Sequence, residues 1–129
     1  MTPGVRRRID VLALSRDTTA VEPFAAALER ERMQVDVACT VADALRWFLA
    51  RGGHELLVIL PGTPLRLARA AIEKLREVQA GLVVVAFGRE WDELPRGTVR
   101  LRDYHPSSRA GVFALLRVLR AAQPPTLPG

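Results

Sequence analysis

The segment His54-Glu55-Leu56-Leu57-Val58-Ile59-Leu60-Pro61-Gly62 decides the fold of this chain. It holds an unbroken apolar run that starts at Leu56, with Gly52-Gly53 before it and Pro61-Gly62 after it. The run is too short for a helix, and it lacks the alternation of a strand that has one face in water. We therefore expect a strand that is buried on both faces, with helices packed above and below it.

Segments with strand and helix patterns alternate on both sides of this central run. Short apolar runs are separated by stretches in which apolar residues repeat at helical spacing, as in proteins with a parallel sheet and crossover helices. The predicted fold class is α/β: a three-layer, flavodoxin-like, doubly wound parallel sheet of five strands in the order 2-1-3-4-5. The expected strands are 9–14, 35–39, 56–60, 82–87 and 98–102, and the expected helices are 21–33, 40–51, 63–80, 89–94 and 107–122.

Polar residues stand where three of these helices are expected to begin. Thr40 opens a capping-box pattern, in which side-chain oxygens accept hydrogen bonds from the free amide groups of a helix start. Thr63 precedes Pro64, which suits the first position of a helix because no amide hydrogen is needed there. Ser107 or Ser108 is expected to cap the last helix.

The composition is that of one soluble domain. Residues 1–122 are assigned to this domain, and the proline-rich residues 123–129 to a tail or the start of a linker. The net charge of +5 comes almost wholly from arginine, because Lys74 is the only lysine. Cys39 is the only cysteine, which excludes a disulfide framework and favours a reducing cytoplasm. No apolar stretch approaches the length of a membrane span, so we expect a cytoplasmic protein that is not exported.

The carboxyl ends of the first, third and fourth strands are where a fold of this kind binds its ligands. Leu60 ends the central strand, and no acid, His, Cys or Ser follows it closely. Ser15, Cys39, His54 and His105 could suggest an active site, but each has a structural explanation as a cap, a turn residue or a packed side chain. We therefore predict no enzyme, no metal site and no cofactor.

Three parts of the sequence are similar to the receiver domains of two-component response regulators. Residues 28–45 resemble the receiver pattern of a helix end, a second strand and the motif A-A-D-G-E-E-A-L. The stretch from Glu55 to Leu60 resembles the motif D-L-V-L-L-D, and His105-Pro106 resembles a late K-P pair. The resemblance extends from Arg8 to Ala122, and it implies a CheY-like fold and a role in bacterial two-component signal transduction.

The functional residues of receivers do not carry over to this chain. Receivers hold magnesium with two acids after the first strand, and they accept phosphate on an aspartate at the end of the third. The resemblance places Leu60 at the phosphate-accepting position, so it implies a degenerate pseudo-receiver. Its other site-equivalent residues are Ser15, Arg16 and Asp17 after the first strand, Phe87 at the end of the fourth strand, and His105 in place of the lysine.

We therefore expect a phosphorylation-independent signalling or adaptor domain that acts through protein–protein contacts. In receivers the fourth helix, the fifth strand and the fifth helix form the signalling surface. Here that surface is predicted to bind a protein partner or a second copy of the chain, as a homodimer. The residues expected to carry this contact are Trp91 as the anchor, with Arg100, Arg102 and Tyr104 beside it.

Two other functions stay open at this point. One is a nucleic-acid-binding module, which requires arginines of the third helix and the last helix to converge on one face: Arg66, Arg69, Arg76, Arg117 and Arg120. No aromatic residues are interleaved with these arginines to stack on bases, which weakens this interpretation. The other is a response regulator that accepts phosphate on an atypical residue.

Overall fold

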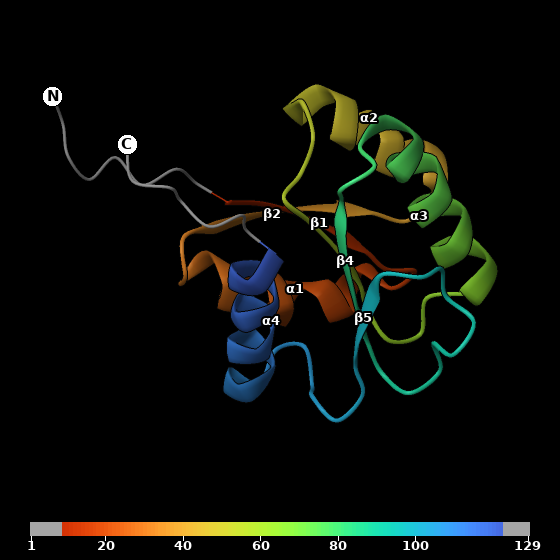
Figure 1. Ribbon diagram of the computed structural model, residues 1–129. Coiled ribbons are helices and arrows are strands. Elements are labelled where there is room, and N and C mark those ends of the chain that lie inside the picture. Colours follow the sequence, from red (N-terminus) through yellow and green to blue (C-terminus); the bar gives the residue numbers. More distant parts are fainter. Residues whose placement is uncertain (1–8, 123–129) are drawn as a thin grey trace, which may run out of the picture.

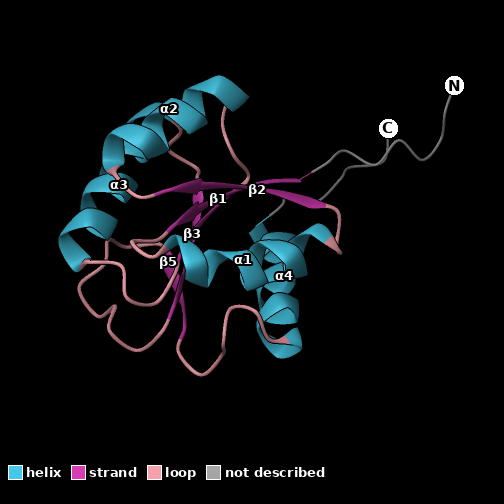
Figure 2. Ribbon diagram, turned by 180° about the vertical axis from the view of Figure 1, so that it is seen from behind, coloured by secondary structure: helices cyan, strands magenta, loops and turns pink. Residues whose placement is uncertain are grey.

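Five parallel strands form a single sheet in the computed structural model of the protein, which describes residues 9–122 (Figures 1 and 2). The strand order is β2-β1-β3-β4-β5, and each neighbouring pair is parallel. This confirms the predicted fold class and strand order. The strands are β1 (Ile9–Leu14), β2 (Met33–Ala38), β3 (Leu56–Ile59), β4 (Val83–Phe87) and β5 (Thr98–Leu101).

Helices cover the sheet on both faces and make the fold a three-layer sandwich. The helices α1 (Thr18–Glu29) and α4 (Arg109–Ala122) lie on one side of the sheet. The helices α2 (Val41–Arg51) and α3 (Leu65–Val78) lie on the other side, above the sheet in Figure 1. The core is accordingly divided into two apolar clusters, one between the sheet and each helix pair.

The central strand β3 joins these two clusters. All four of its side chains are 0% exposed, and they alternate between the two faces. Leu57 packs in the cluster beneath α2 and α3, whereas Leu56 and Val58 pack in the cluster against α1 and α4. A strand buried in this way has no polar face, which explains why its sequence is continuously apolar.

Local capping signals place several helix ends correctly. The Thr40 hydroxyl accepts a hydrogen bond from the Asp43 amide at 3.0 Å, as the capping-box pattern predicts. Gly52 ends α2 with a φ of 72°, a left-handed conformation that glycine adopts without steric cost. The Ser108 hydroxyl accepts from the Gly111 amide at 3.0 Å, so Ser108 rather than Ser107 caps α4.

Two predicted element boundaries are wrong for reasons of tertiary contact and backbone conformation. Thr63 does not cap α3: its hydroxyl donates instead to the carbonyl oxygens of Leu60 and Leu14, at 2.7 and 3.2 Å, and α3 starts without a side-chain cap. The predicted extension of the first helix to Met33 also fails. Arg32 adopts a φ of 62°, which turns the chain so that Met33 starts β2 instead.

The predicted short helix at 89–94 does not form. Turns connect β4 to β5 over this stretch, and the helix after β5, α4, is therefore the last of four helices in residues 9–122. The Trp91 and Leu94 side chains are 1% and 6% exposed, and both pack in the cluster beneath α2 and α3. Two side chains of this loop thus cover the apolar cluster in the way that a helix would have done. On α4, the Phe113 side chain is 51% exposed.

The two ends of the chain, 1–8 and 123–129, lie outside the described residues, and so does the predicted tail or linker. Within residues 9–122, no helix is both long and apolar enough to cross a membrane.

Candidate functional site at the carboxyl edge of the sheet

Ser15 is the first residue beyond β1 and is held in a turn. Its side chain is buried, its amide donates to the Ala38 carbonyl at 3.1 Å, and its hydroxyl donates to the Asp17 carbonyl at 3.0 Å. The same hydroxyl accepts from the Asp17 amide at 3.2 Å. Both hydrogen-bonding roles of the hydroxyl are therefore used within the turn, and Ser15 acts as a turn cap rather than as a nucleophile.

Asp17 is the N-cap of α1. Its carboxylate accepts from the Thr19 hydroxyl at 2.7 Å and from the Thr19 amide at 3.0 Å. These hydrogen bonds hold the pKa of Asp17 below its ordinary value, because they favour the charged form. The neighbouring Arg16 side chain is exposed. The acid that follows β1 therefore belongs to a helix start, where a carboxylate is stabilised by the free amide groups.

Leu60 lies at the carboxyl end of the central strand and points into the apolar core. It is 1% exposed and packs in the cluster against α1 and α4, together with Phe24 and Phe87. Its amide donates to the Leu14 carbonyl at 3.1 Å. The position at which receivers carry their phosphate-accepting aspartate, by resemblance, thus holds a buried apolar side chain.

Phe87 closes the same edge at the end of β4. Its ring is 0% exposed and meets the Phe24 ring edge-on, with the centroids 6.1 Å apart. The Phe87 carbonyl accepts from the Trp91 indole N–H at 2.7 Å. The Phe24–Phe87 pair packs on the face that α1 and α4 cover, and the Trp91 indole packs on the face that α2 and α3 cover. The end of β4 is therefore covered by aromatic side chains on both faces of the sheet.

His105 is exposed, and its hydrogen bonds are made within its own turn rather than with a catalytic partner. Its Nδ1 accepts from the Ser107 amide at 3.2 Å and lies 2.9 Å from the Ser107 hydroxyl. Its carbonyl accepts from the amide and hydroxyl of Ser108, at 3.1 and 2.8 Å. His105 therefore organises the turn before α4. Among residues 9–122, no three His, Cys, Asp or Glu side chains are grouped so that they could hold a metal ion.

The predicted partner surface is only partly exposed. Trp91, expected to anchor a partner, is buried, and its indole is used in the hydrogen bond to Phe87. Its role as an exposed anchor is therefore a wrong prediction. Arg100 is half-buried and donates from Nε to the Trp91 carbonyl at 2.5 Å, so its guanidinium holds the loop between β4 and β5 in place.

Arg102 and Tyr104 remain accessible on this surface. Arg102 is exposed and pairs with Asp92 at 2.9 Å, while Tyr104 is half-buried against the cluster that α1 and α4 cover. Asp103 between them pairs with Arg89 across the loop. Ion pairs as exposed as these contribute at most about 1 kcal/mol each, so the arginines can exchange their partners readily.

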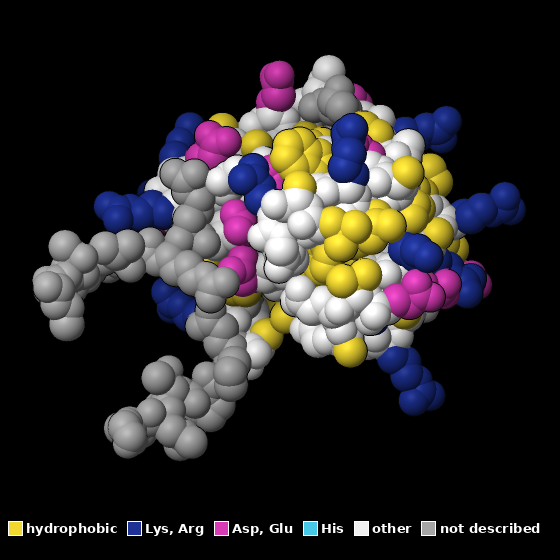
Figure 3. All heavy atoms as spheres, turned by 90° about the horizontal axis from the view of Figure 1, so that it is seen from above, with side chains coloured by type: hydrophobic (Ala, Val, Ile, Leu, Met, Phe, Trp, Pro, Cys, Tyr) yellow, Lys and Arg dark blue, Asp and Glu magenta, His cyan; other side chains and the backbone are white. Residues whose placement is uncertain are grey.

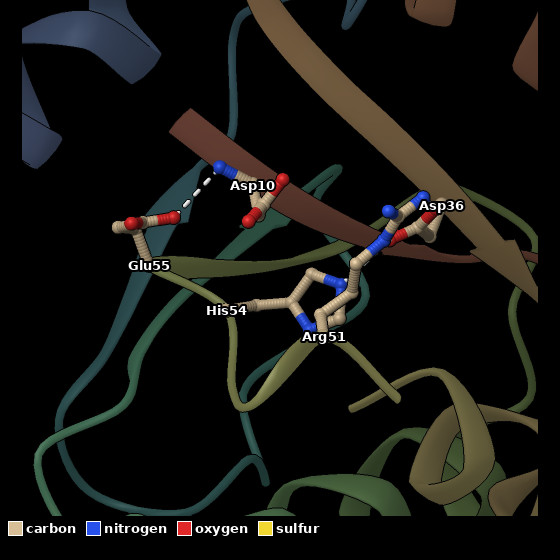
Figure 4. A network of polar contacts seen from close by, with 5 residues as sticks. All are labelled: Asp10, Asp36, Arg51, His54 and Glu55. Atoms are coloured by element: carbon tan, nitrogen blue, oxygen red, sulfur yellow. Dashed lines mark hydrogen bonds and ion pairs between the residues drawn. The ribbon is translucent and has the colours of Figure 1, made fainter. Parts of the chain in front are cut away.

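Sequence reasoning missed a polar network on the face that α2 and α3 cover (Figure 4). Asp36 of β2 accepts two hydrogen bonds from Arg51, both at 2.9 Å, and its Oδ2 lies 2.9 Å from Nε2 of His54. At the start of the neighbouring strands, Glu55 accepts from the Asp10 amide at 2.6 Å. An acid at an inward position of an apolar strand is the signal that could have predicted a cationic partner for Asp36.

Asp36 and Arg51 compensate each other's charge within this network. Burial by itself raises the pKa of Asp36, but the hydrogen bonds from Arg51 and His54 outweigh it, so the pKa lies below its ordinary value. The same contact raises the pKa of Arg51. His54 stacks on Phe48 with the centroids 5.6 Å apart, and its buried Nδ1 has no hydrogen-bond partner among the described residues. The network connects β2, the end of α2 and the start of β3, which is a structural role.

Comparison with known proteins gives a likeness in structure and none in sequence. No protein-family model matches the chain, and no curated protein sequence matches it. A CheY-like receiver domain from Methanospirillum hungatei superposes with a TM-score of 0.69 at 16% identity, over 90% of this chain and 97% of that chain. The chain has the CheY-like receiver fold.

Two further receivers show the same fold at equally low identity. The chemotaxis response regulator CheY4 of Vibrio cholerae matches with a TM-score of 0.66 and 15% identity, over 87% of this chain and 99% of that chain. A receiver domain from Methylobacillus flagellatus matches with a TM-score of 0.64 and 21% identity, over 88% and 99% of the two chains. The likeness to receiver domains in these three comparisons thus extends over 87–90% of this chain.

Proposed function

We propose that the protein is a receiver-like signalling or adaptor domain that works without phosphorylation, through contacts with a protein partner. The observation that carries this proposal is the burial of Leu60 at the end of β3. Receivers switch when an aspartate at this position accepts a phosphoryl group. In this chain the position belongs to the core, so the domain presents a constant surface instead of a phosphorylation-dependent one.

The chemistry of the carboxyl edge supports this proposal. Phosphoryl transfer to a receiver needs a carboxylate nucleophile and a divalent cation that neutralises the charge on the phosphoryl oxygens. Leu60 offers no nucleophile, and Asp17 is engaged as the N-cap of α1. Arg16 adds a permanent positive charge next to Asp17, which works against cation binding. The same arrangement supports a domain that is not an enzyme and needs no cofactor.

A protein partner, or a second copy in a homodimer, is proposed to dock on the face of β5 and α4. Arg102 and Tyr104 are the side chains on this face that suit an interface, because arginine and tyrosine are enriched at binding hot spots.

Another surface that could bind a partner lies over α2 and α3, where hydrophobic side chains gather among charged ones (Figure 3). Leu49 and Val78 of these helices are 60% and 54% exposed. We place this adaptor role in the cytoplasm.

The two alternatives, nucleic-acid binding and phosphate acceptance on an atypical residue, have less structural support. Arg66 and Arg69 are exposed on α3, whereas Arg117 and Arg120 are exposed on α4, and these helices cover opposite faces of the sheet. Of the α3 arginines, only the half-buried Arg76 lines a pocket together with the end of α4. The arginines therefore do not form one continuous face for a nucleic-acid backbone. For an atypical phosphoacceptor, Asp17 is the first acid after the carboxyl end of β1, and its carboxylate is already hydrogen-bonded.

Treatment with acetyl phosphate and magnesium tests the proposal directly. Intact-mass analysis is expected to show no added phosphoryl group, while a conventional receiver domain treated in parallel gains one. Beryllofluoride with magnesium is expected to leave the fluorescence of Trp47 and Trp91 unchanged. A phosphoryl adduct on this protein, or a magnesium-dependent fluorescence change, would show that phosphorylation regulates it after all.

A further inference from the structure

A groove of about 640 Å³ lies at the amino ends of β4 and β5, the edge of the sheet opposite the receiver site. Its floor is apolar and comes from three elements that are distant in sequence. Val83 starts β4, Val99 lies in β5, and Val118 lies in the last turns of α4, and all three are half-buried. We call this feature the amino-edge groove. The groove is open to solvent, which suits a chain segment laid across it better than an enclosed small molecule.

Two arginines stand at the rim of the amino-edge groove, and no acidic residue lines it. Arg76 of α3 donates from Nη1 to the Arg96 carbonyl at 2.8 Å, which holds its guanidinium beside the groove. Neither Arg76 nor Arg96 has an ion pair with a carboxylate among residues 9–122. The groove therefore has two arginines without an ion-pair partner next to an apolar floor.

Gly97, next to Arg96, lets the Arg76 guanidinium lie against the backbone of the loop. Gly97 has a φ of 86°, and a Cβ atom at this position would lie 3.3 Å from Nη2 of Arg76. Glycine here both permits the left-handed turn and lets the guanidinium approach the chain. The wall formed by Arg96 and Gly97 belongs to the loop that replaces a helix between β4 and β5, so the groove depends on a specific feature of this chain.

The charge extends beyond the groove itself. Residues 95–122 contain six arginines, of which Arg102 pairs with Asp92, and one acid, Asp103, which pairs with Arg89. At the groove, a positive field of this kind raises the association rate of acidic partners and favours them over a second copy of this chain, whose net charge is +5.

We propose that the amino-edge groove binds an acidic, extended segment of a partner protein, with apolar side chains on the valine floor and carboxylates on Arg76 and Arg96. This inference rests on the proposed function, because it names the chemistry of the partner. Arginine pairs with carboxylates in a bidentate geometry, and an apolar floor gives an additional contact that a phosphate backbone does not need. Residues 123–129 start next to Ala122, which lines the groove, but they contain no acid and would leave both arginines unpaired.

Selection of peptides against the full chain tests the inference. A library of random dodecapeptides is panned on the immobilised protein, and the enriched peptides are synthesised with a fluorescent label. We expect the enriched sequences to combine Asp or Glu with Leu, Ile, Val or Phe. The double variant R76E/R96E is expected to lower their affinity at least tenfold, and the exposed variant R96E alone to lower it severalfold.

The matched control is R66E/R69E, which makes the same change of charge on another part of α3. It is expected to leave peptide affinity within about twofold. Circular dichroism and thermal unfolding of each variant check that the fold is retained, and the single variant R96E keeps the test valid if R76E disturbs α3. Chemical-shift changes in NMR spectra are expected at Val83, Val99 and Val118.

Several results would overturn the inference. They are the absence of enriched peptides, enriched peptides without acidic residues, or binding that R76E/R96E leaves unchanged. A single-stranded dodecanucleotide that binds as tightly as the peptides, and equally depends on Arg76 and Arg96, would assign the groove to nucleic acid. A synthetic peptide of residues 123–129 that competes more strongly than the acidic peptides would assign it to the chain itself. None of these results affects the acetyl phosphate experiment, so failure of the groove and failure of the proposed function are distinguishable.

Discussion

Replacing Leu60 with alanine tests whether the carboxyl end of β3 is part of the core. The side chain is 1% exposed and belongs to the same apolar cluster as the paired rings of Phe24 and Phe87, whose rigidity limits how far the site can collapse. A buried leucine-to-alanine change costs about 2–5 kcal/mol, and the larger costs occur where the site cannot collapse. We therefore expect a loss of roughly 3–5 kcal/mol, a large share of the ~5–15 kcal/mol that stabilises a typical domain.

Urea unfolding followed by circular dichroism measures this loss as a shift of the transition midpoint. Leu49→Ala is the matched control, because it removes the same atoms from a side chain that is 60% exposed. The control is expected to change the unfolding free energy by no more than about 0.5 kcal/mol. If Leu60→Ala and Leu49→Ala were equally mild, Leu60 would not be a core residue, and the argument against a phosphorylation site would lose its basis.

Leu60→Asp extends the same experiment to function. A carboxylate in this apolar cluster lacks hydrogen-bond donors, so its folded-state pKa is expected to rise above the unfolded value. The penalty relative to Leu60→Ala should then be small at acid pH, where the group is neutral in both states, and grow as pH rises through the folded pKa. Acetyl phosphate is expected not to modify the variant. An unchanged melting temperature, or a phosphoryl adduct, would contradict the assignment of Leu60 to the core.

Two further substitutions test the buried polar contacts. Asp36→Asn removes the charge that pairs with Arg51 and His54 and should cost about 3 kcal/mol at neutral pH by urea unfolding. The pKa of Asp36 is lowered in the folded state, so the stability difference between the wild type and Asp36→Asn is present above about pH 4. The difference should shrink as pH falls through the folded pKa. A difference that stays constant down to pH 2 would refute the role of the charge. Trp91→Phe removes the indole donor to the Phe87 carbonyl and should cost about 1–3 kcal/mol in thermal or urea unfolding, whereas an exposed Trp91 would tolerate the change without loss.

The candidate receiver site was largely predictable, because what defines it is a residue type at a sequence position. Leu60 and Phe87 were expected at the ends of their strands, and their side chains cannot provide a nucleophile in any conformation. The position of Trp91 was not predictable in the same way. An aromatic residue in a polar loop is compatible with an exposed anchor or with a core plug, and only the packing of the loop between β4 and β5 decides which of the two occurs.

The sequence by itself determined the strands, the four helices that form and their order, because these depend on local periodicity and backbone preference; the loop at 89–94 is the exception. The apolar run from Leu56 specifies a strand with two buried faces, and Thr40 and Gly52 mark the ends of α2 through contacts within a few residues. Parallel pairing then follows from the alternation of strands and helices.

Only the tertiary structure decided the contacts between residues distant in the chain. The Thr63 hydroxyl donates to the Leu14 carbonyl, 49 residues away in sequence, instead of capping the start of α3. Asp36 forms hydrogen bonds with Arg51 and His54 because the fold brings β2, the end of α2 and the start of β3 together. The amino-edge groove exists because the ends of β4, β5 and α4 leave space between them. Such contacts depend on the relative placement of whole elements, and local propensity carries no information about that placement.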